Sequence, residues 1–177
     1  ELLQASIDIL QGNEIELLPD FPTGGILDPS DYNQGRGKVK LRAKIDTPNE
    51  KTLIIKEICY GTTTESLTRS IDEAAKKGKI KIDSINDYTA ENVEIEIKLP
   101  RGQYAEKVID ALYAFTDCQV SLNSQVLLIK DHMPWETSVN EVLEHQTYLL
   151  KDYLKSELEI EFDMIVEKIF QKTLEQI

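Results

Sequence analysis

Residues 38–45 read Lys38-Val39-Lys40-Leu41-Arg42-Ala43-Lys44-Ile45, a strict alternation of cations and apolar residues. Successive side chains of a strand point to opposite faces, so the apolar residues share one face and the cations the other. The next segment, Thr47-Pro48-Asn49-Glu50, has the composition of a hairpin turn. We therefore expect residues 38–45 to form a half-buried strand, paired antiparallel with a second strand at residues 53–58.

The segments around this hairpin carry both helical and strand patterns, and a connection rich in turn residues occupies residues 19–37. Three helices are expected before residue 120. The first covers residues 2–10, the second begins at a cap at Thr63 or Thr64 and ends at Gly78, and the third follows Pro100-Arg101-Gly102. Strands are expected at residues 80–85, 93–99 and, with an interruption at Asn123-Ser124, 120–129. The fold class is therefore α+β, an antiparallel sheet with flanking helices, followed by long helices.

From Trp135 onward, apolar residues keep helical spacing and no Gly or Pro interrupts them. After Leu149 the apolar stripe advances in steps of four, which drifts around a helix of 3.6 residues per turn, so we expect a bend near residues 157–163. The helix would form a projecting arm or pack against the sheet, and its length favours the arm. The first helix begins at Glu1 and the last continues to Ile177 without a stop signal, so both ends are expected to be cut inside a helix.

The net charge of −12 argues at first against nucleic acid, because phosphate repels an acidic protein. The charge is unevenly spread, however: five cations and no acid lie between Arg36 and Lys44. A basic strip on an acidic body can still bind DNA. Cys59 and Cys118 have no disulfide or metal spacing and are expected to be buried. No segment resembles a membrane span or a signal peptide, and we expect a cytoplasmic protein.

The sequence contains no recognisable catalytic or metal-binding motif. His132 and His145 have no partner motif, and a surface or structural role is favoured for both. Three aspartates of the expected loop could bind a cation but are more often turn formers: Asp20, Asp28 and Asp31. We therefore assign no catalytic residue and no metal ligand.

Five short motifs follow one another between residues 19 and 121. They are Pro19-Asp20-Phe21-Pro22-Thr23-Gly24-Gly25, Gln34-Gly35-Arg36-Gly37-Lys38-Val39, Arg42-Ala43-Lys44, Glu57-Ile58-Cys59-Tyr60-Gly61 and Gln119-Val120-Ser121. In sequence and spacing they resemble signature segments of the A subunits of bacterial gyrase and topoisomerase IV, with topoisomerase IV the nearer. Leu18 stands where that family usually has Gly, and Cys59 where it usually has Pro. Each departure affects a turn locally and neither touches the basic strip.

The resemblance implies a fragment of the DNA breakage-reunion subunit of a type IIA topoisomerase, which passes one duplex through a double-strand break. Residues 1–133 would form an N-terminally incomplete tower domain, and residues 134–177 the start of the coiled-coil arm. The family's nucleophile is a tyrosine preceded by arginine, and none of the seven tyrosines here follows an arginine. The fragment alone is therefore expected to be inactive. The resemblance implies three partners: double-stranded DNA, an ATPase B-type subunit that carries ATP and magnesium, and a second copy of the A subunit.

The basic strip is the candidate DNA-binding site. We expect Arg36, Lys38, Lys40 and Arg42 to contact backbone phosphates, because cations at alternate strand positions can follow a phosphate row without reading bases. The alternative is a solvated strand face whose lysines pair with Glu94 and Glu96 on a neighbouring strand. At the level of the whole protein, the alternatives are a non-enzymatic α+β nucleic-acid-binding module and a dimerising scaffold.

Overall fold

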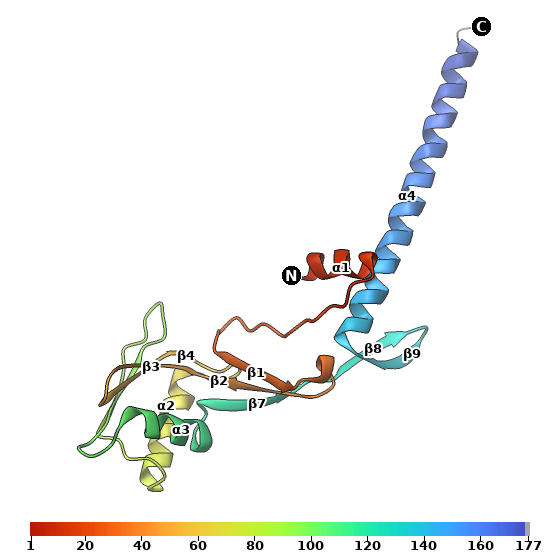
Figure 1. Cartoon of the computed structure of the whole chain (residues 1–177). Coiled ribbons are helices and arrows are strands. Elements are labelled where there is room, and N and C mark those ends of the chain that lie inside the picture. The colour runs from red at the N-terminus through yellow and green to blue at the C-terminus, as the bar shows by residue number, and fades with distance from the viewer. Residues whose placement is uncertain (176–177) are drawn as a thin grey trace. The chain divides into compact units, whose positions relative to one another are not determined.

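The computed structural model describes residues 1–175, and their strands form three antiparallel sheets (Figure 1). The first sheet has the order β1-β2-β7, with β1 at Ile26–Asp31, β2 at Lys38–Arg42 and β7 at Gln119–Asn123. The second has the order β3-β4-β6-β5, with β3 at Lys44–Asn49, β4 at Thr52–Glu57, β6 at Ile95–Lys98 and β5 at Ser84–Asp87. The third is a hairpin of β8 (Val126–Lys130) and β9 (Met133–Thr137). With the helices described below, these sheets confirm the α+β class.

The chain divides into two compact units. Residues Leu18–Gln125 form one unit, which contains the first two sheets and two helices. Glu1–Leu17 and the chain from Val126 onward form the other, which contains the hairpin and two further helices. We describe each unit by itself.

The predicted strand at residues 38–45 is divided between two sheets. Its first part, β2, pairs with β1 and β7, and only from Lys44 does the chain pair with β4, as β3. At the change of sheet, the amide of Ala43 donates to the carbonyl of Cys118 at 2.7 Å, and its carbonyl accepts from the Tyr113 hydroxyl at 2.9 Å. The expected pairing of the whole strand with residues 53–58 is therefore wrong for residues 38–42. The alternation itself is confirmed, because Val39, Leu41 and Ala43 are all buried.

The hairpin turn lies later than predicted. β3 continues through Pro48 to Asn49, whose side-chain oxygen accepts from the Lys51 amide at 3.0 Å, so the turn is at residues 50–51. Proline is tolerated there because β3 is an edge strand of its sheet and does not need every amide. The strand predicted at residues 80–85 also begins later, at Ser84.

Helices α2 (Thr64–Lys76) and α3 (Ala105–Phe115) complete the core of the Leu18–Gln125 unit. Both supply three buried apolar side chains, which join those of β4 and β6: Leu67, Ile71, Ala74, Ala105, Val108, Leu112, Leu53, Ile55, Ile95 and Ile97. Apolar residues at helical spacing in α2 and α3, and at strand spacing in β4 and β6, therefore form one continuous core.

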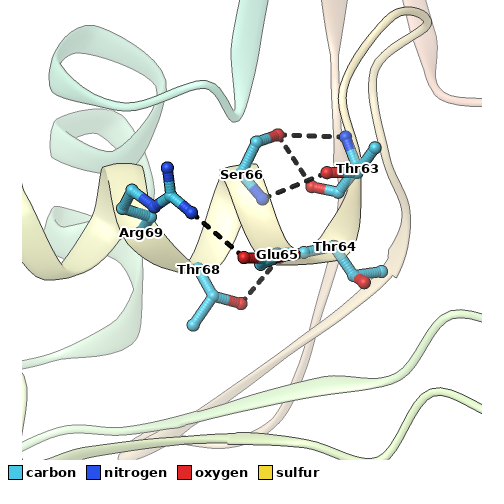
Figure 2. A network of polar contacts seen from close by, with 6 residues as sticks. All are labelled: Thr63, Thr64, Glu65, Ser66, Thr68 and Arg69. Carbon is cyan, nitrogen blue, oxygen red and sulfur yellow. Dashed lines mark hydrogen bonds and ion pairs between the residues drawn. The ribbon is translucent and has the colours of Figure 1, made fainter.

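The start of α2 is fixed by a reciprocal cap, as Figure 2 shows. The Ser66 amide donates to the Thr63 hydroxyl at 3.1 Å, and the Thr63 amide donates to the Ser66 hydroxyl at 3.0 Å. Two amides that the helix leaves without partners are thereby satisfied. Glu65 and Arg69 form an ion pair one turn apart at 3.0 Å. The predicted cap is therefore confirmed at Thr63.

In the other unit, α1 (Leu2–Gln11) and α4 (Val139–Glu175) accompany the hairpin. The prediction of a helical pattern from Trp135 onward is wrong for its first residues, because Trp135 lies in β9, opposite Leu128. The predicted bend is also wrong: α4 continues without a break through residues 157–163. Apolar side chains along its length are exposed, among them Tyr153, Leu158, Phe162, Ile165 and Ile169. The expectation for Ile177 lies outside the described residues.

Candidate nucleic-acid interface

The three cations of β2 occupy the middle row of a three-stranded sheet face. Lys38, Lys40 and Arg42 are two residues apart, so they share the face opposite the buried Val39 and Leu41. Lys38 is exposed, while Lys40 and Arg42 are half-buried. Strand geometry spaces such residues by roughly 6.8 Å, at about 3.4 Å per residue. The structure therefore brings three of the four predicted site residues into one row.

Arg36 lies outside this row. It follows the short 3-10 helix η1 (Asn33–Gly35) and precedes β2, and its amide donates to the Asn33 carbonyl at 3.1 Å. Gly37 lies between Arg36 and Lys38, and its backbone passes very close to the end of β1. A Cβ at Gly37 would lie 3.0 Å from the carbonyl oxygen of Tyr32. Arg36 is thus placed by the turn rather than by the strand.

Strand β1 lines one side of the row with carboxylates. Asp31 stands opposite Lys38, and Asp28 opposite Lys40. The Lys40 ammonium is 3.9 Å from a carboxylate oxygen of Asp31, and the two side chains are 41% and 68% exposed, so this ion pair is weak. Asp28 accepts instead from the amide and hydroxyl of Ser30, which hold its pKa below the usual range, with Lys40 as a smaller cause. The two carboxylates reduce the positive potential on this side without burying the lysines.

Strand β7 lines the other side of the row without any charge. Asn123, Ser121 and Gln119 stand opposite Lys38, Lys40 and Arg42 in turn. Amide and hydroxyl side chains can donate to phosphate oxygens as well as accept from cations. The face therefore combines a row of cations with a row of neutral donors.

Arg42 is held more firmly than the two lysines. Its Nε donates to the side-chain oxygen of Gln119 at 2.7 Å, and its guanidinium carbon lies 5.4 Å from the centre of the Tyr113 ring. Burial raises the pKa of Tyr113, whose hydroxyl donates to the Ala43 carbonyl. The sequence offered a signal only for Gln119, as part of Gln119-Val120-Ser121, and none for Tyr113.

The pairing expected under the alternative interpretation is wrong. Glu94 pairs with Lys56 at 3.2 Å and Glu96 with Lys98 at 3.4 Å, both in the second sheet rather than beside β2. For Lys38, no ion pair occurs within residues 1–175.

The two motifs Pro19–Gly25 and Glu57–Gly61 meet at the end of this face. The Glu57 carboxylate accepts from the Gly25 amide and lies 3.3 Å from the Lys44 ammonium. The Gly25 bond, and then Lys44, lower the pKa of Glu57. The rings of Phe21 and Tyr60 are 5.4 Å apart. Segments more than 30 residues apart are thus joined by a charged hydrogen bond and an aromatic contact.

The remaining candidates of the sequence serve the fold. Asp20 and Asp28 accept from the neighbouring amides of Phe21 and Ser30. The prediction that these aspartates lie in a loop is wrong for Asp28 and Asp31, which belong to β1. Cys59 and Cys118 are fully buried as expected, and burial raises the pKa of Cys118 to about 11.

Among residues 1–175 no cluster of three or more His, Cys, Asp or Glu side chains could hold a metal ion. Within the same range, no helix is both long and apolar enough to cross a membrane.

Comparisons with known proteins agree with the motifs. The family profile for the A subunits of DNA gyrase and topoisomerase IV matches residues 1–176. The chain is 49% identical to the DNA topoisomerase 4 A subunit of Borreliella burgdorferi, over all of this chain and 28% of that protein. It is 32% identical to the DNA topoisomerase 4 A subunit of Staphylococcus epidermidis and 33% identical to the DNA gyrase A subunit of Lawsonia intracellularis. Those matches cover 80% and 75% of this chain, and 20% and 17% of the two relatives.

The chain thus spans between 17% and 28% of the length of these relatives. The profile nevertheless extends over both structural units, including the helix α4. The chain belongs to the family of DNA gyrase and topoisomerase IV A subunits.

Proposed function

We propose that this chain is the part of a type IIA topoisomerase A subunit that supports the bent gate DNA through phosphate contacts. The observation that carries the proposal is the row Lys38, Lys40 and Arg42 on an open sheet face, with neutral donors along one side. Arg36, in the turn just before the strand, is the fourth cation that we propose contacts phosphate. Such contacts give affinity and register without sequence specificity.

The contribution of this part would be geometric. Bending a duplex costs on the order of 1–6 kcal/mol, and cationic contacts away from the point of cleavage offset that cost. The family membership supports DNA as the ligand. The net charge of −12 does not oppose this, because many acids of the chain lie far along the sequence from the segment 36–44, which contains five cations and no acid. The residues from 131 to 177, for example, carry eleven acids and four lysines.

The chemistry of strand cleavage would be supplied by other parts of the enzyme. No tyrosine of this chain follows an arginine, so no residue here matches the nucleophile motif. ATP and magnesium would be bound by a B-type partner subunit, and a second copy of the A subunit would complete the enzyme in the cytoplasm. This part by itself would be inactive.

The long helix supports the second element of the proposal, in which residues 1–133 form the tower domain and residues 134–177 begin the coiled-coil arm. The apolar residues along α4 are exposed over several turns, and a single helix in water is not stabilised by such exposure. A dimerising scaffold is the alternative that this helix favours. Sedimentation distinguishes the two, because a scaffold predicts a dimer of the 177-residue chain and the arm predicts a monomer.

The basic row is tested by charge reversal in the complete A subunit. The variant Lys38→Glu/Lys40→Glu/Arg42→Glu is compared with Lys76→Glu/Lys77→Glu/Lys81→Glu, which makes the same change of charge on exposed residues at and after the end of α2. We expect the first variant to lose affinity for a long duplex and to slow relaxation of supercoiled DNA, and the second to do neither. Equal effects of the two variants would show that total charge, rather than this row, governs binding.

A further inference from the structure

We propose that Gln119 and Tyr113 are positioning residues that present the guanidinium of Arg42 to one backbone phosphate. The inference rests on the proposed function, since it names the geometry by which one cation of the row would bind DNA. It adds two uncharged residues to the interface, from β7 and α3, that act through Arg42 rather than on DNA.

The first argument is the pattern of donors. A guanidinium has five N–H donors, and the Nε–H of Arg42 is already directed at Gln119, 2.7 Å away. Among the described residues, the two Nη groups take part in no hydrogen bond or ion pair. The bond to Gln119 therefore occupies one edge of the guanidinium and leaves the Nη edge for a phosphate, which arginine can bind through two parallel bonds.

The second argument is the aromatic contact of the guanidinium group. The Tyr113 ring lies 5.4 Å from the guanidinium carbon and limits tilting of the group. The ring is itself fixed, because its hydroxyl donates to the Ala43 carbonyl at the point where the chain changes sheets. Two contacts, a hydrogen bond to Nε and a ring contact near the guanidinium carbon, restrict a side chain that would otherwise sample many rotamers.

The third argument is a comparison within the row. Lys40 has only a 3.9 Å contact with the exposed Asp31, and Lys38 has no ion pair in residues 1–175. Arg42 alone of the three is held by neutral groups, Gln119 and Tyr113, and its attraction to the Asp28 carboxylate is the last among the causes that lower the pKa of Asp28. A neutral hydrogen-bond partner leaves the charge of the guanidinium available to a phosphate, whereas a carboxylate partner would compete with the phosphate for it.

The expected effect follows from the cost of ordering a side chain on binding. Fixing one rotamer-rich side chain corresponds to about a twofold to tenfold change in affinity. Loss of the Gln119 bond should therefore weaken binding of a duplex by about that factor. It should leave the dependence on salt unchanged, because the number of cations at the interface is the same.

The test measures binding of a fluorescein-labelled duplex to the complete A subunit, by anisotropy at several salt concentrations. Gln119→Met removes the acceptor with little change of volume, and Gln103→Met is the control at a glutamine just before α3. Arg42→Lys keeps the charge but cannot form the Nε bond. Thermal unfolding of every variant verifies that it is folded. Tyr113→Leu, which removes the ring contact with Arg42, should weaken binding by about twofold to tenfold, as Gln119→Met does.

We expect Gln119→Met to weaken binding when Arg42 is present and to have no further effect in the Arg42→Lys background. Equal weakening in both backgrounds, or none in either, would overturn the positioning role. Arg42→Met is measured alongside to test the underlying contact. If it changes neither the affinity nor the salt slope, Arg42 does not bind phosphate, and the failure lies with the proposed function. If it lowers both while Gln119→Met has no effect, only the positioning role fails.

Discussion

Replacing Gly37 by alanine tests how the turn before β2 places the basic row. The glycine joins Arg36 to Lys38, and its carbonyl accepts from the Ser124 amide at 2.7 Å. A Cβ at this position would overlap the carbonyl oxygen of Asp31 and lie 3.0 Å from that of Tyr32. Both obstacles are backbone atoms, which cannot rotate aside, so β1 and β2 would have to separate.

The size of the effect follows from the kind of clash. Inserting a methyl group into a packed site costs typically about 1–3 kcal/mol, and an overlap with backbone places Gly37→Ala near the upper end. Gly78→Ala is the matched control in the same unit, with a φ of +70° and nothing within 4 Å of the added Cβ. It should cost about 1 kcal/mol, from the left-handed backbone alone.

Urea unfolding of the two variants, followed by circular dichroism, gives the comparison. We expect Gly37→Ala to lower the free energy of unfolding by about 2 kcal/mol more than Gly78→Ala does. Its DNA affinity in the complete A subunit should also fall, because Lys38 moves with the strand. If Gly37→Ala unfolds at the same urea concentration as Gly78→Ala, the close approach of β1 and Gly37 does not exist in solution.

Three further predictions concern the remaining polar and sulfur groups. The pKa of Glu57 is lowered in the folded protein, so its carboxylate stabilises the fold above the ordinary pKa of 4.5, and this stabilisation is lost as the pH falls through the folded pKa. In acid unfolding below pH 4.5, the Glu57→Gln variant should therefore lose stability less steeply than the unmodified protein. Thr63→Ala removes the cap of α2 and should lower the free energy of unfolding by about 1 kcal/mol. Thr68→Ala, inside the same helix, should change it by less than about 0.5 kcal/mol, and equal effects of the two variants would argue against the cap. Cys59 and Cys118 should resist a chromogenic disulfide reagent at about pH 8 and react only on unfolding, because burial raises the pKa of both thiols; rapid reaction of the native protein would contradict this.

The sequence predicted those parts of the fold that depend on local pattern. Alternation between residues 38 and 45 identified the buried and exposed faces correctly, and Thr63 was identified as a cap from its place before an apolar helical stripe. The exchange of strand partners at Ala43 was not predictable, because it depends on contacts with Cys118 and Tyr113, about 70 residues away. Residues 135–137 were assigned to a helix, although they lie in β9, because a strand of five residues leaves no periodic signal of its own.

The candidate site divides in the same way. Period-two spacing is enough to place Lys38, Lys40 and Arg42 on one face, since it follows from strand geometry. The neighbours of that row could not be predicted, because they depend on the register of β1 and β7. Asp28 and Asp31 on one side, and Gln119 on the other, are set by pairings across the sheet.

The dependence of duplex affinity on salt is the most direct test of the phosphate contacts. In the complete A subunit, Lys38→Gln, Lys40→Gln and Arg42→Gln are measured singly and together over a range of salt concentrations. Each phosphate contact contributes roughly 0.9 to the slope of log affinity against log salt concentration, so each single variant should reduce the slope by about that amount and the triple variant by roughly 2.7. A triple variant whose slope equals that of the unmodified protein would contradict the account, because it would show that these cations do not contact DNA.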